Sequence, residues 1–241
     1  MSTPVIGAGS VKPVESEHPA DYKRIYVWQF PVRLFHWVAA ISIFLLCVTG
    51  FLIGHPLHVF YAAQAYQQYW FGWVRFIHFV CAFAVVAVSG VRLYWAFVGN
   101  RYANWRNFLP LKRGQWLSIW ELVNVEVLQI KKTGRYHVGH NIMAATSYFF
   151  LLLAFVFQTV TGFALYSSMS TLRVTHIFDW IVPLMGGDAN VRFWHHAFLW
   201  IFVLFMIVHV YLVFYDDYVE AGGEMSAMVS GWKFKRDDRE K

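Results

Sequence analysis

Residues 194–213 read WHHAFLWIFVLFMIVHVYLV and combine a nearly apolar helix with a histidine pair near one end and a lone histidine near the other. An ionisable side chain inside a membrane helix costs free energy, so its presence points to a function. His195 and His209 are separated by fourteen positions, which places them about 21 Å apart along a helix and about 40° apart around it. His196 and His209 would lie about 140° apart around the helix axis. His195 therefore shares a helix face with His209.

The rest of the chain indicates what positions these histidines. Of its 241 residues, 58% are hydrophobic and 14% are charged, with a mean hydropathy of +0.43, whereas a soluble domain carries about 25% charged residues. A helix needs about 20 apolar residues to cross about 30 Å of hydrocarbon. The segments that meet this length are Leu34–Ile53, Phe71–Val98, Ile142–Tyr166 and Phe193–Tyr215. We predict an all-α integral membrane four-helix bundle.

The positions of lysine and arginine predict how the bundle is oriented. The loop 99–140 carries seven of them, and the loop between the first two apolar segments carries none. The positive-inside rule then places both termini and the 99–140 loop in the cytoplasm of a bacterial inner membrane. We expect a cytoplasmic tail over 1–24, a membrane domain over 25–232 and a charged tail over 233–241. The net charge of +6 indicates contact with anionic lipid and no nucleic acid.

Two more histidines lie in apolar segments, His36 in RLFHW and His78 in RFIHF. On the predicted topology, the first helix enters from the cytoplasm and carries His36 near its inner end. The second and fourth helices enter from outside, which places His78 and His195 in the outer half and His209 in the inner half. Depth thus pairs His78 with His195 near the periplasm and His36 with His209 near the cytoplasm.

Two bis-histidine layers suit two b-type haems, because iron with imidazole at both axial positions passes single electrons. Covalent c-type haem is excluded, since no CxxCH motif is present. A zinc site is disfavoured, because no cysteine or carboxylate lies at the depth of these histidines. A hydrogen-bonded helix contact is the alternative for any single one of them. The histidines of the outer loops, His55, His58 and His176, are expected to be solvated.

Other polar residues lie near the predicted inner face. Arg33 and Arg92 are candidates for ion pairs with haem propionates, with lipid headgroups as the alternative partner. Tyr136, His140 and Asn141 lie at the depth of the inner haem, and we predict that they contact quinone. An ordinary polar helix end is the alternative interpretation of this group.

Two patterns describe the packing of the bundle. VTGF occurs at 48–51 and again at 160–163, and such small residues let helix backbones, or a flat ligand, approach closely. Plain helix packing is the alternative. In the 99–140 loop, apolar residues recur at helical spacing and predict a cytoplasmic interfacial amphipathic helix; they are Trp116, Trp120, Val123, Val127 and Ile130.

Over residues 24–232, the chain resembles the b-type cytochrome subunit of membrane-bound nickel–iron hydrogenases. The stretches that carry the resemblance are RLFHWVAAISIFLLCVTG (33–50), RFIHF (75–79), RLYWAFVGNRYANW (92–105), GHN (139–141), TGFALY (161–166) and WHHAFLWIFVLFMIVHVY (194–211). An R-x-x-H-W sequence that opens a helix closing in TG is fairly specific to this family.

The resemblance implies two haems with axial ligands at His36, His78, His195 and His209, in the pairing that depth gives. It also implies that the iron–sulfur chain of the hydrogenase small subunit, itself bound to the large subunit, delivers electrons to the outer haem. The inner haem would then reduce quinone in the membrane. The chain would be an electron-transfer subunit without a hydrogen-splitting metal or a catalytic residue of its own. His196, beside His195, leaves open which neighbour binds iron, and the shared face favours His195.

Two other functions predict different observations. The gamma subunit of a formate dehydrogenase, or a related quinone-linked cytochrome, would use the same histidines with another soluble partner. The stretch RLYWAFVGNRYANW favours the hydrogenase. A proton-conducting or metal-transporting protein would bind no haem, and its reduced-minus-oxidised spectrum would lack a b-type alpha band.

Overall fold

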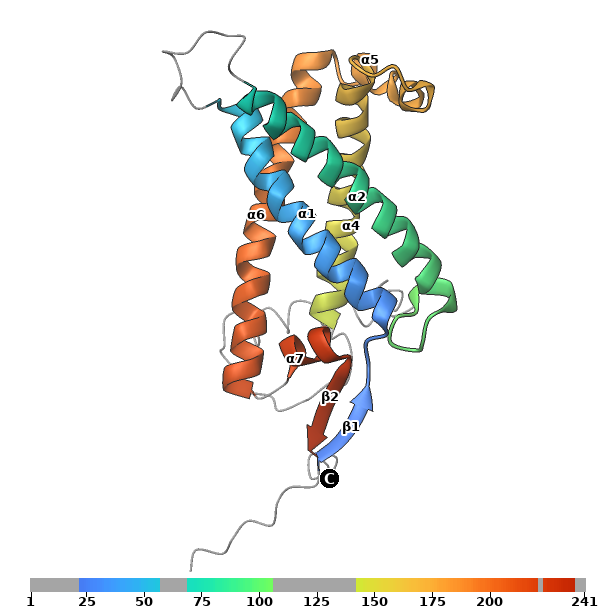
Figure 1. The fold of residues 1–241 in the computed structure, drawn as a ribbon, viewed down its shortest axis with the longest axis vertical. Helices are drawn as coiled ribbons and strands as arrows, with labels where there is room; N and C mark the ends of the chain where they lie inside the picture. The colour runs from blue at the N-terminus through green and yellow to red at the C-terminus, as the bar shows by residue number, and fades with distance from the viewer. Residues whose placement is uncertain (1–21, 57–68, 106–141, 221–222, 237–241) are drawn as a thin grey trace, which may run out of the picture.

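The computed structural model describes residues 22–56, 69–105, 142–220 and 223–236. Four long helices dominate it (Figure 1): α1 (Phe30–Gly54), α2 (Trp70–Val98), α4 (Ile142–Ser167) and α6 (Asp188–Tyr215). Each contains a stretch long and apolar enough to cross a membrane. The predicted all-α four-helix membrane bundle is confirmed.

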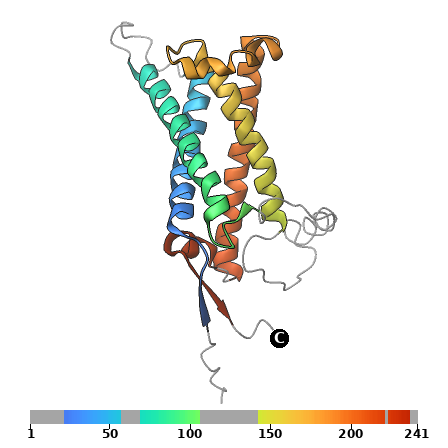
Figure 2. The same cartoon turned by 90° about the vertical axis from the view of Figure 1, so that its right-hand side faces the viewer.

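The helices pack through small side chains. α1 lies along α2, α4 lies along α6, and α1 also contacts α6 (Figures 1 and 2). Buried positions of α1 and α4 are occupied by Ala39, Ser42, Thr49, Ala154, Thr161 and Ala164. Short side chains of this kind let helix backbones approach each other in lipid. Only 11% to 22% of the most apolar window of each helix is buried, so most apolar side chains face outward, where lipid would cover them.

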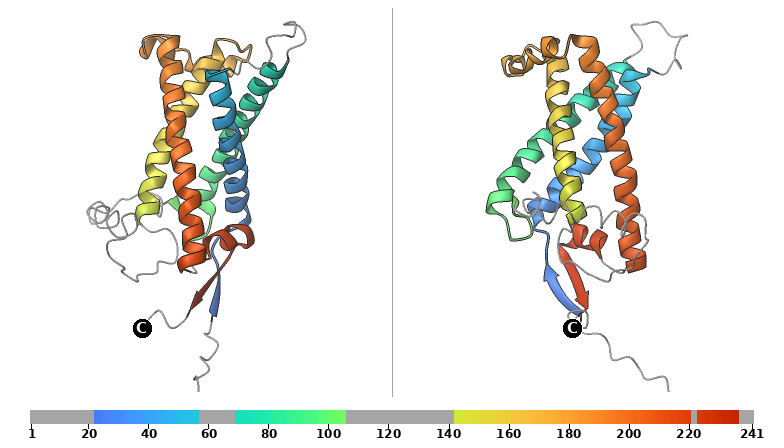
Figure 3. Two further views of the ribbon diagram at one scale, coloured as in Figure 1. Left: turned by 90° about the vertical axis from the view of Figure 1, so that its left-hand side faces the viewer. Right: turned by 180° about the vertical axis from the view of Figure 1, so that it is seen from behind.

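The two ends of the bundle differ, and we name each by its elements. At the α5 end, α4 is followed by the short 3₁₀-helix η4 (Arg173–Phe178) and by α5 (Ile181–Leu184), before α6 begins (Figure 3). The turn into α6 uses Gly186 and Gly187, whose φ angles are 81° and 114°, a region that suits residues without a Cβ atom.

At the other end, which we call the hairpin end, two short strands pair. These are β1 (Tyr22–Tyr26) and β2 (Trp232–Arg236), which run antiparallel with Tyr26 opposite Trp232. The π-helical turn η5 (Asp216–Glu220) and the helix α7 (Glu224–Ser230) connect α6 toward β2. Both strands cross the segment boundaries that the sequence predicts after residues 24 and 232. The first and last described segments of the chain are thus hydrogen-bonded to each other.

The hairpin end has its own apolar core, which fixes the start of α1. Its buried members come from the segment before α1, from α1, from the turn after α2 and from α7; they are Val27, Trp28, Val32, Ala103 and Ala227. Asn100 donates from Nδ2 to the carbonyl of Val27 at 2.9 Å. The side-chain oxygen of Gln29 accepts from Trp95 Nε1 at 2.9 Å and from the Asn100 amide at 3.0 Å. These bonds hold the beginning of α1 against the end of α2.

Candidate functional site

The inner pair of histidines lies in the half of the bundle nearest the hairpin end. His36 on α1 and His209 on α6 have ring centroids 6.3 Å apart and ring planes inclined at 54°. His209 stacks on Phe205, with centroids 5.3 Å apart and planes inclined at 12°. The Nδ1 atom of His36 is buried and has no hydrogen-bond partner among the described residues. The two imidazoles thus face each other in an apolar setting.

The separation of His36 and His209 fits a metal ion held between the two rings. A metal–imidazole bond is about 2.0–2.1 Å long for zinc. Two such bonds, together with the distance from the bonding nitrogen to the centroid in each ring, add up to a centroid separation close to the observed one. This separation is compatible with a pair of axial ligands, and it also lies within the range of about 4.5–7 Å that directly packed aromatic rings adopt.

The outer pair, His78 on α2 and His195 on α6, lies toward the α5 end. Each imidazole is hydrogen-bonded through Nδ1 to a threonine of another helix. Thr49 Oγ1 of α1 lies 2.9 Å from Nδ1 of His78, and Thr161 Oγ1 of α4 lies 2.9 Å from Nδ1 of His195. The two threonines are buried. All four long helices therefore contribute to the outer layer.

The two VTGF segments explain how these imidazoles come so close to the helices. A Cβ atom added at Gly162 would lie 3.1 Å from Cε1 of His195, and one added at Gly50 would lie 3.5 Å from Cε1 of His78. The absence of a side chain at Gly162 thus leaves space for the His195 ring, whereas the tightest neighbour of a Cβ atom at Gly50 would be Leu199, at 3.2 Å. The repeated motif predicts close approach, and the structure places a histidine imidazole against each copy.

His196 faces a different neighbour from His195. Its Cε1 lies only 2.6 Å from the place where a Cβ atom of Gly54 would be. Its ring centroid is 5.2 Å from that of His55, which in turn stacks on Phe51 at 5.3 Å. His196 therefore packs against the last turn of α1, away from Thr161. This arrangement supports the choice of His195, rather than His196, as the ligand candidate.

The remaining predicted site residues lie at the hairpin end or outside the described residues. Arg33 donates from Nη1 to the carbonyl of Val229 at 2.5 Å, and Arg92 donates from Nη2 to the carbonyl of Ala103 at 3.2 Å. Both guanidinium groups are near the inner pair's end of the bundle, and their pairing with propionates stays a prediction. The predicted quinone residues, Tyr136, His140 and Asn141, and the predicted amphipathic helix lie within 106–141, which the structure does not describe.

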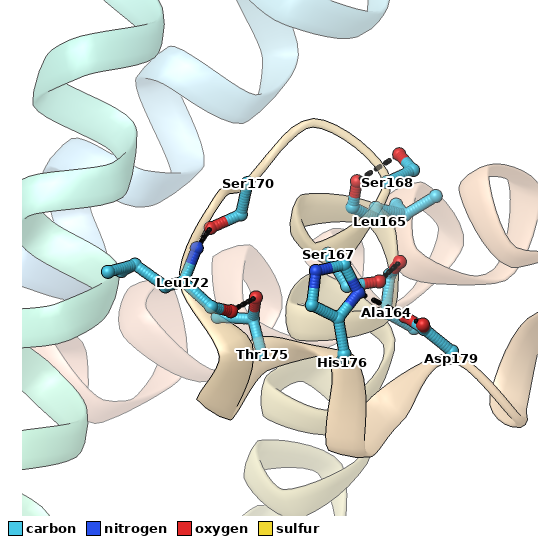
Figure 4. Close-up of polar contacts among 9 residues, drawn as sticks. All are labelled: Ala164, Leu165, Ser167, Ser168, Ser170, Leu172, Thr175, His176 and Asp179. Carbon is cyan, nitrogen blue, oxygen red and sulfur yellow. Dashed lines mark hydrogen bonds and ion pairs between the residues drawn. The ribbon is translucent and has the colours of Figure 1, made fainter.

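A pocket of about 310 Å³ opens at the α5 end, and Figure 4 shows polar contacts among residues of this region. His176 Nδ1 lies 3.0 Å from Asp179 Oδ2, and hydrogen bonds from Ser167 and His176 lower the pKa of the Asp179 carboxyl. The pocket is lined by Ala164, Ser167, Ser168, Ser170, His176, Asp179, Val182 and Asp188. None of the predicted ligands lines it. Within the described residues, no cluster of three or more His, Cys, Asp or Glu side chains could hold a metal ion by itself.

Comparison with known proteins identifies the family of the chain. Residues 27–231 match the family described as prokaryotic cytochrome b561. A protein of Azotobacter vinelandii is 38% identical over 219 residues, covering 89% of this chain and 90% of the relative. One of Escherichia coli K12 is 34% identical over 215 residues, covering 86% of this chain and 90% of the relative. The first is named "Probable Ni/Fe-hydrogenase B-type cytochrome subunit" and the second "Probable Ni/Fe-hydrogenase 1 B-type cytochrome subunit". Because the family match spans all four long helices and both histidine pairs, the chain belongs to the prokaryotic cytochrome b561 family.

Proposed function

We propose that this chain carries electrons from the iron–sulfur chain of a nickel–iron hydrogenase through two b haems to quinone in the membrane. The names of the relatives support the hydrogenase as partner. The observation that carries the proposal is the pair of histidine layers, with His36 and His209 toward the hairpin end and His78 and His195 toward the α5 end. Two separate bis-histidine sites give a path for single electrons along the bundle.

Within this proposal, the protein supplies the ligands and the surroundings of the haems. Haem b supplies reversible one-electron chemistry when bound. α6 carries one ligand of each pair, so a single continuous helix sets the distance between the two sites. Apolar side chains of the four helices exclude water and lower the local dielectric, which helps to tune the potential of a bound haem.

The proposed orientation determines the side of the membrane on which each partner would lie. The lysine and arginine pattern places the hairpin end in the cytoplasm and the α5 end at the periplasm of the inner membrane. The hydrogenase small subunit would then dock at the α5 end, next to the outer haem, with the large subunit beyond it. Quinone would accept electrons near the inner haem.

The quinone contact is assigned to Tyr136, His140 and Asn141, which precede α4 and carry groups able to bond to quinone oxygens. We expect that His140→Ala and Asn141→Ala each slow hydrogen-dependent quinone reduction by about tenfold, a loss of the size that one hydrogen bond accounts for. Both haems should stay fully loaded in these variants. Unchanged turnover in both would place the quinone elsewhere.

Copurification and a haem count test the proposed function as a whole. The complex isolated through a tag on this chain should contain nickel–iron hydrogenase subunits and two haems b per chain. Its dithionite-reduced-minus-oxidised spectrum should show a b-type alpha band, and a redox titration should resolve two components. A single component, a colourless preparation or a molybdenum formate dehydrogenase in place of the nickel enzyme would contradict the proposal.

A further inference from the structure

We propose that Thr49 and Thr161 are positioning residues for the outer haem. Each hydroxyl holds the imidazole of one ligand, His78 or His195, in the tautomer that leaves Nε2 free to bind iron. This inference rests on the proposed function, because it takes His78 and His195 as ligands. It adds a pair of threonines that select the orientation and the electron-donating strength of those ligands.

The geometry is the same at both positions. Each Oγ1 atom lies 2.9 Å from the Nδ1 atom of its histidine, a normal hydrogen-bond distance. Thr49 is 5% exposed and Thr161 is 1% exposed, so bulk water does not compete for either contact. The threonines come from α1 and α4, and the histidines come from α2 and α6. Each contact therefore joins two helices at the level of the outer pair.

The backbone determines which atom donates in each contact. The hydroxyl of Thr49 donates to the carbonyl of Leu45 at 2.6 Å, and that of Thr161 donates to the carbonyl of Phe157 at 2.7 Å. A hydroxyl has one proton and a carbonyl can only accept. With that proton directed to the carbonyl, the oxygen lone pair faces the imidazole, so Nδ1–H must be the donor. The proton then lies on Nδ1, and Nε2 keeps the lone pair that a metal needs.

The inner pair does not share this arrangement. Among the described residues, Nδ1 of His36 has no hydrogen-bond partner, and the ring of His209 packs against those of Phe205 and His36. A hydrogen bond accepted from Nδ1–H makes an imidazole a stronger donor to its metal. Stronger donation favours oxidised iron, so the two threonines should lower the reduction potential of the outer haem. Loss of either hydroxyl should raise that potential and leave the inner haem unchanged.

The glycine after each threonine completes the arrangement. A Cβ atom at Gly162 would lie 3.1 Å from the His195 ring, tighter than ordinary van der Waals contact. In α4 the TG pair thus provides a hydrogen-bond acceptor and, one residue later, the space that the His195 ring occupies. In α1 a Cβ atom at Gly50 would make ordinary contact with the His78 ring, at 3.5 Å, and a tighter one with Leu199, at 3.2 Å. The threonine contact is therefore the feature that the two copies share.

The test replaces each threonine by valine, which keeps the shape of the side chain and removes the hydroxyl. In the complex with hydrogenase, Thr49→Val and Thr161→Val should each bind the outer haem about tenfold to a hundredfold more weakly, as is typical when the bonding partner of a metal ligand is lost. The midpoint potential of the outer haem should shift upward, and the g-values of its low-spin EPR signal should change. Thr49→Ser and Thr161→Ser, which restore a hydroxyl, should restore both readouts.

Thr175→Val is the matched control. Thr175 is also buried, and its hydroxyl donates to the Leu172 carbonyl at 2.7 Å in η4, so the substitution removes a comparable bond outside the outer layer. It should leave both haem signals unchanged. An equal effect of Thr175→Val and Thr49→Val would overturn the inference, as would wild-type potentials and EPR signals in both outer-layer valine variants.

Failure of the inference can be told apart from failure of the proposed function. If His78→Ala and His195→Ala retain the outer haem, the ligand assignment itself is wrong, whatever the threonine variants do. If those alanine variants lose the haem and the valine variants behave as wild type, only the role of the threonines is wrong. Because Thr49 and Thr161 lie on different helices, either position gives a complete test if the other variant does not accumulate.

Discussion

His78→Ala is expected to abolish the outer haem and to leave the inner haem in place. His78 supplies one of two axial nitrogens, and removal of a ligand also leaves a cavity in the wall of the site. The haem content should fall from two to one per chain, and one component should disappear from the redox titration. Hydrogen-dependent quinone reduction should fall to background, because the hydrogenase loses its first electron acceptor in the membrane.

Two controls separate this loss from general damage. Reduction of a soluble dye by hydrogen should be unaffected, since the hydrogenase subunits perform it without this chain. His176→Ala should retain both haems, because His176 lies exposed in η4 with Asp179 as its partner. Full haem content in His78→Ala, or loss of the inner component in place of the outer one, would contradict the assignment.

His36→Ala should produce the opposite defect. The inner haem should be missing while the outer one remains, because His36 faces His209 at the hairpin end, far from Thr49 and Thr161. Addition of hydrogen to this variant should reduce the outer haem rapidly, and no quinol should form. Stopped-flow absorbance in the alpha band, together with extraction of quinol, measures the two events separately.

The partner histidines provide the check on pairing. His209→Ala should reproduce the spectrum of His36→Ala, and His195→Ala should reproduce that of His78→Ala, since each pair would hold one iron. Loss of the same spectral component in His36→Ala and His78→Ala would show that the pairs are assigned wrongly. His196→Ala is expected to retain both haems, because its ring packs on Gly54 and His55.

The features that the sequence predicts well are those set by length and angle along a helix. A membrane helix needs a long apolar run, so four such runs are enough to predict the bundle. Fourteen residues of α6 are predicted to place His195 and His209 on one face, and in the structure His209 lies near His36 of α1 and His195 near Thr161 of α4. The resemblance of the chain to hydrogenase cytochromes is confirmed by the family match over 27–231.

Contacts between distant segments are harder to predict. The pairing of β1 with β2 places Tyr26 opposite Trp232, and neither strand has a local sequence pattern from which its partner strand could be identified. The roles proposed for Thr49 and Thr161 are equally hard to predict from the sequence, because a threonine in an apolar helix usually bonds to its own backbone. The available signal was their depth, since each threonine lies beside a repeated glycine at the level of a predicted ligand.

The antiparallel pairing at the hairpin end has a consequence for biogenesis. During synthesis β1 is made before the four long helices and β2 after them, so the sheet can close only once α6 and α7 have been made. The contacts of Arg33 with Val229 and of Trp37 with Met228 must also wait for that moment. The first turns of α1, on either side of His36, therefore gain these contacts only after α7 has been synthesised.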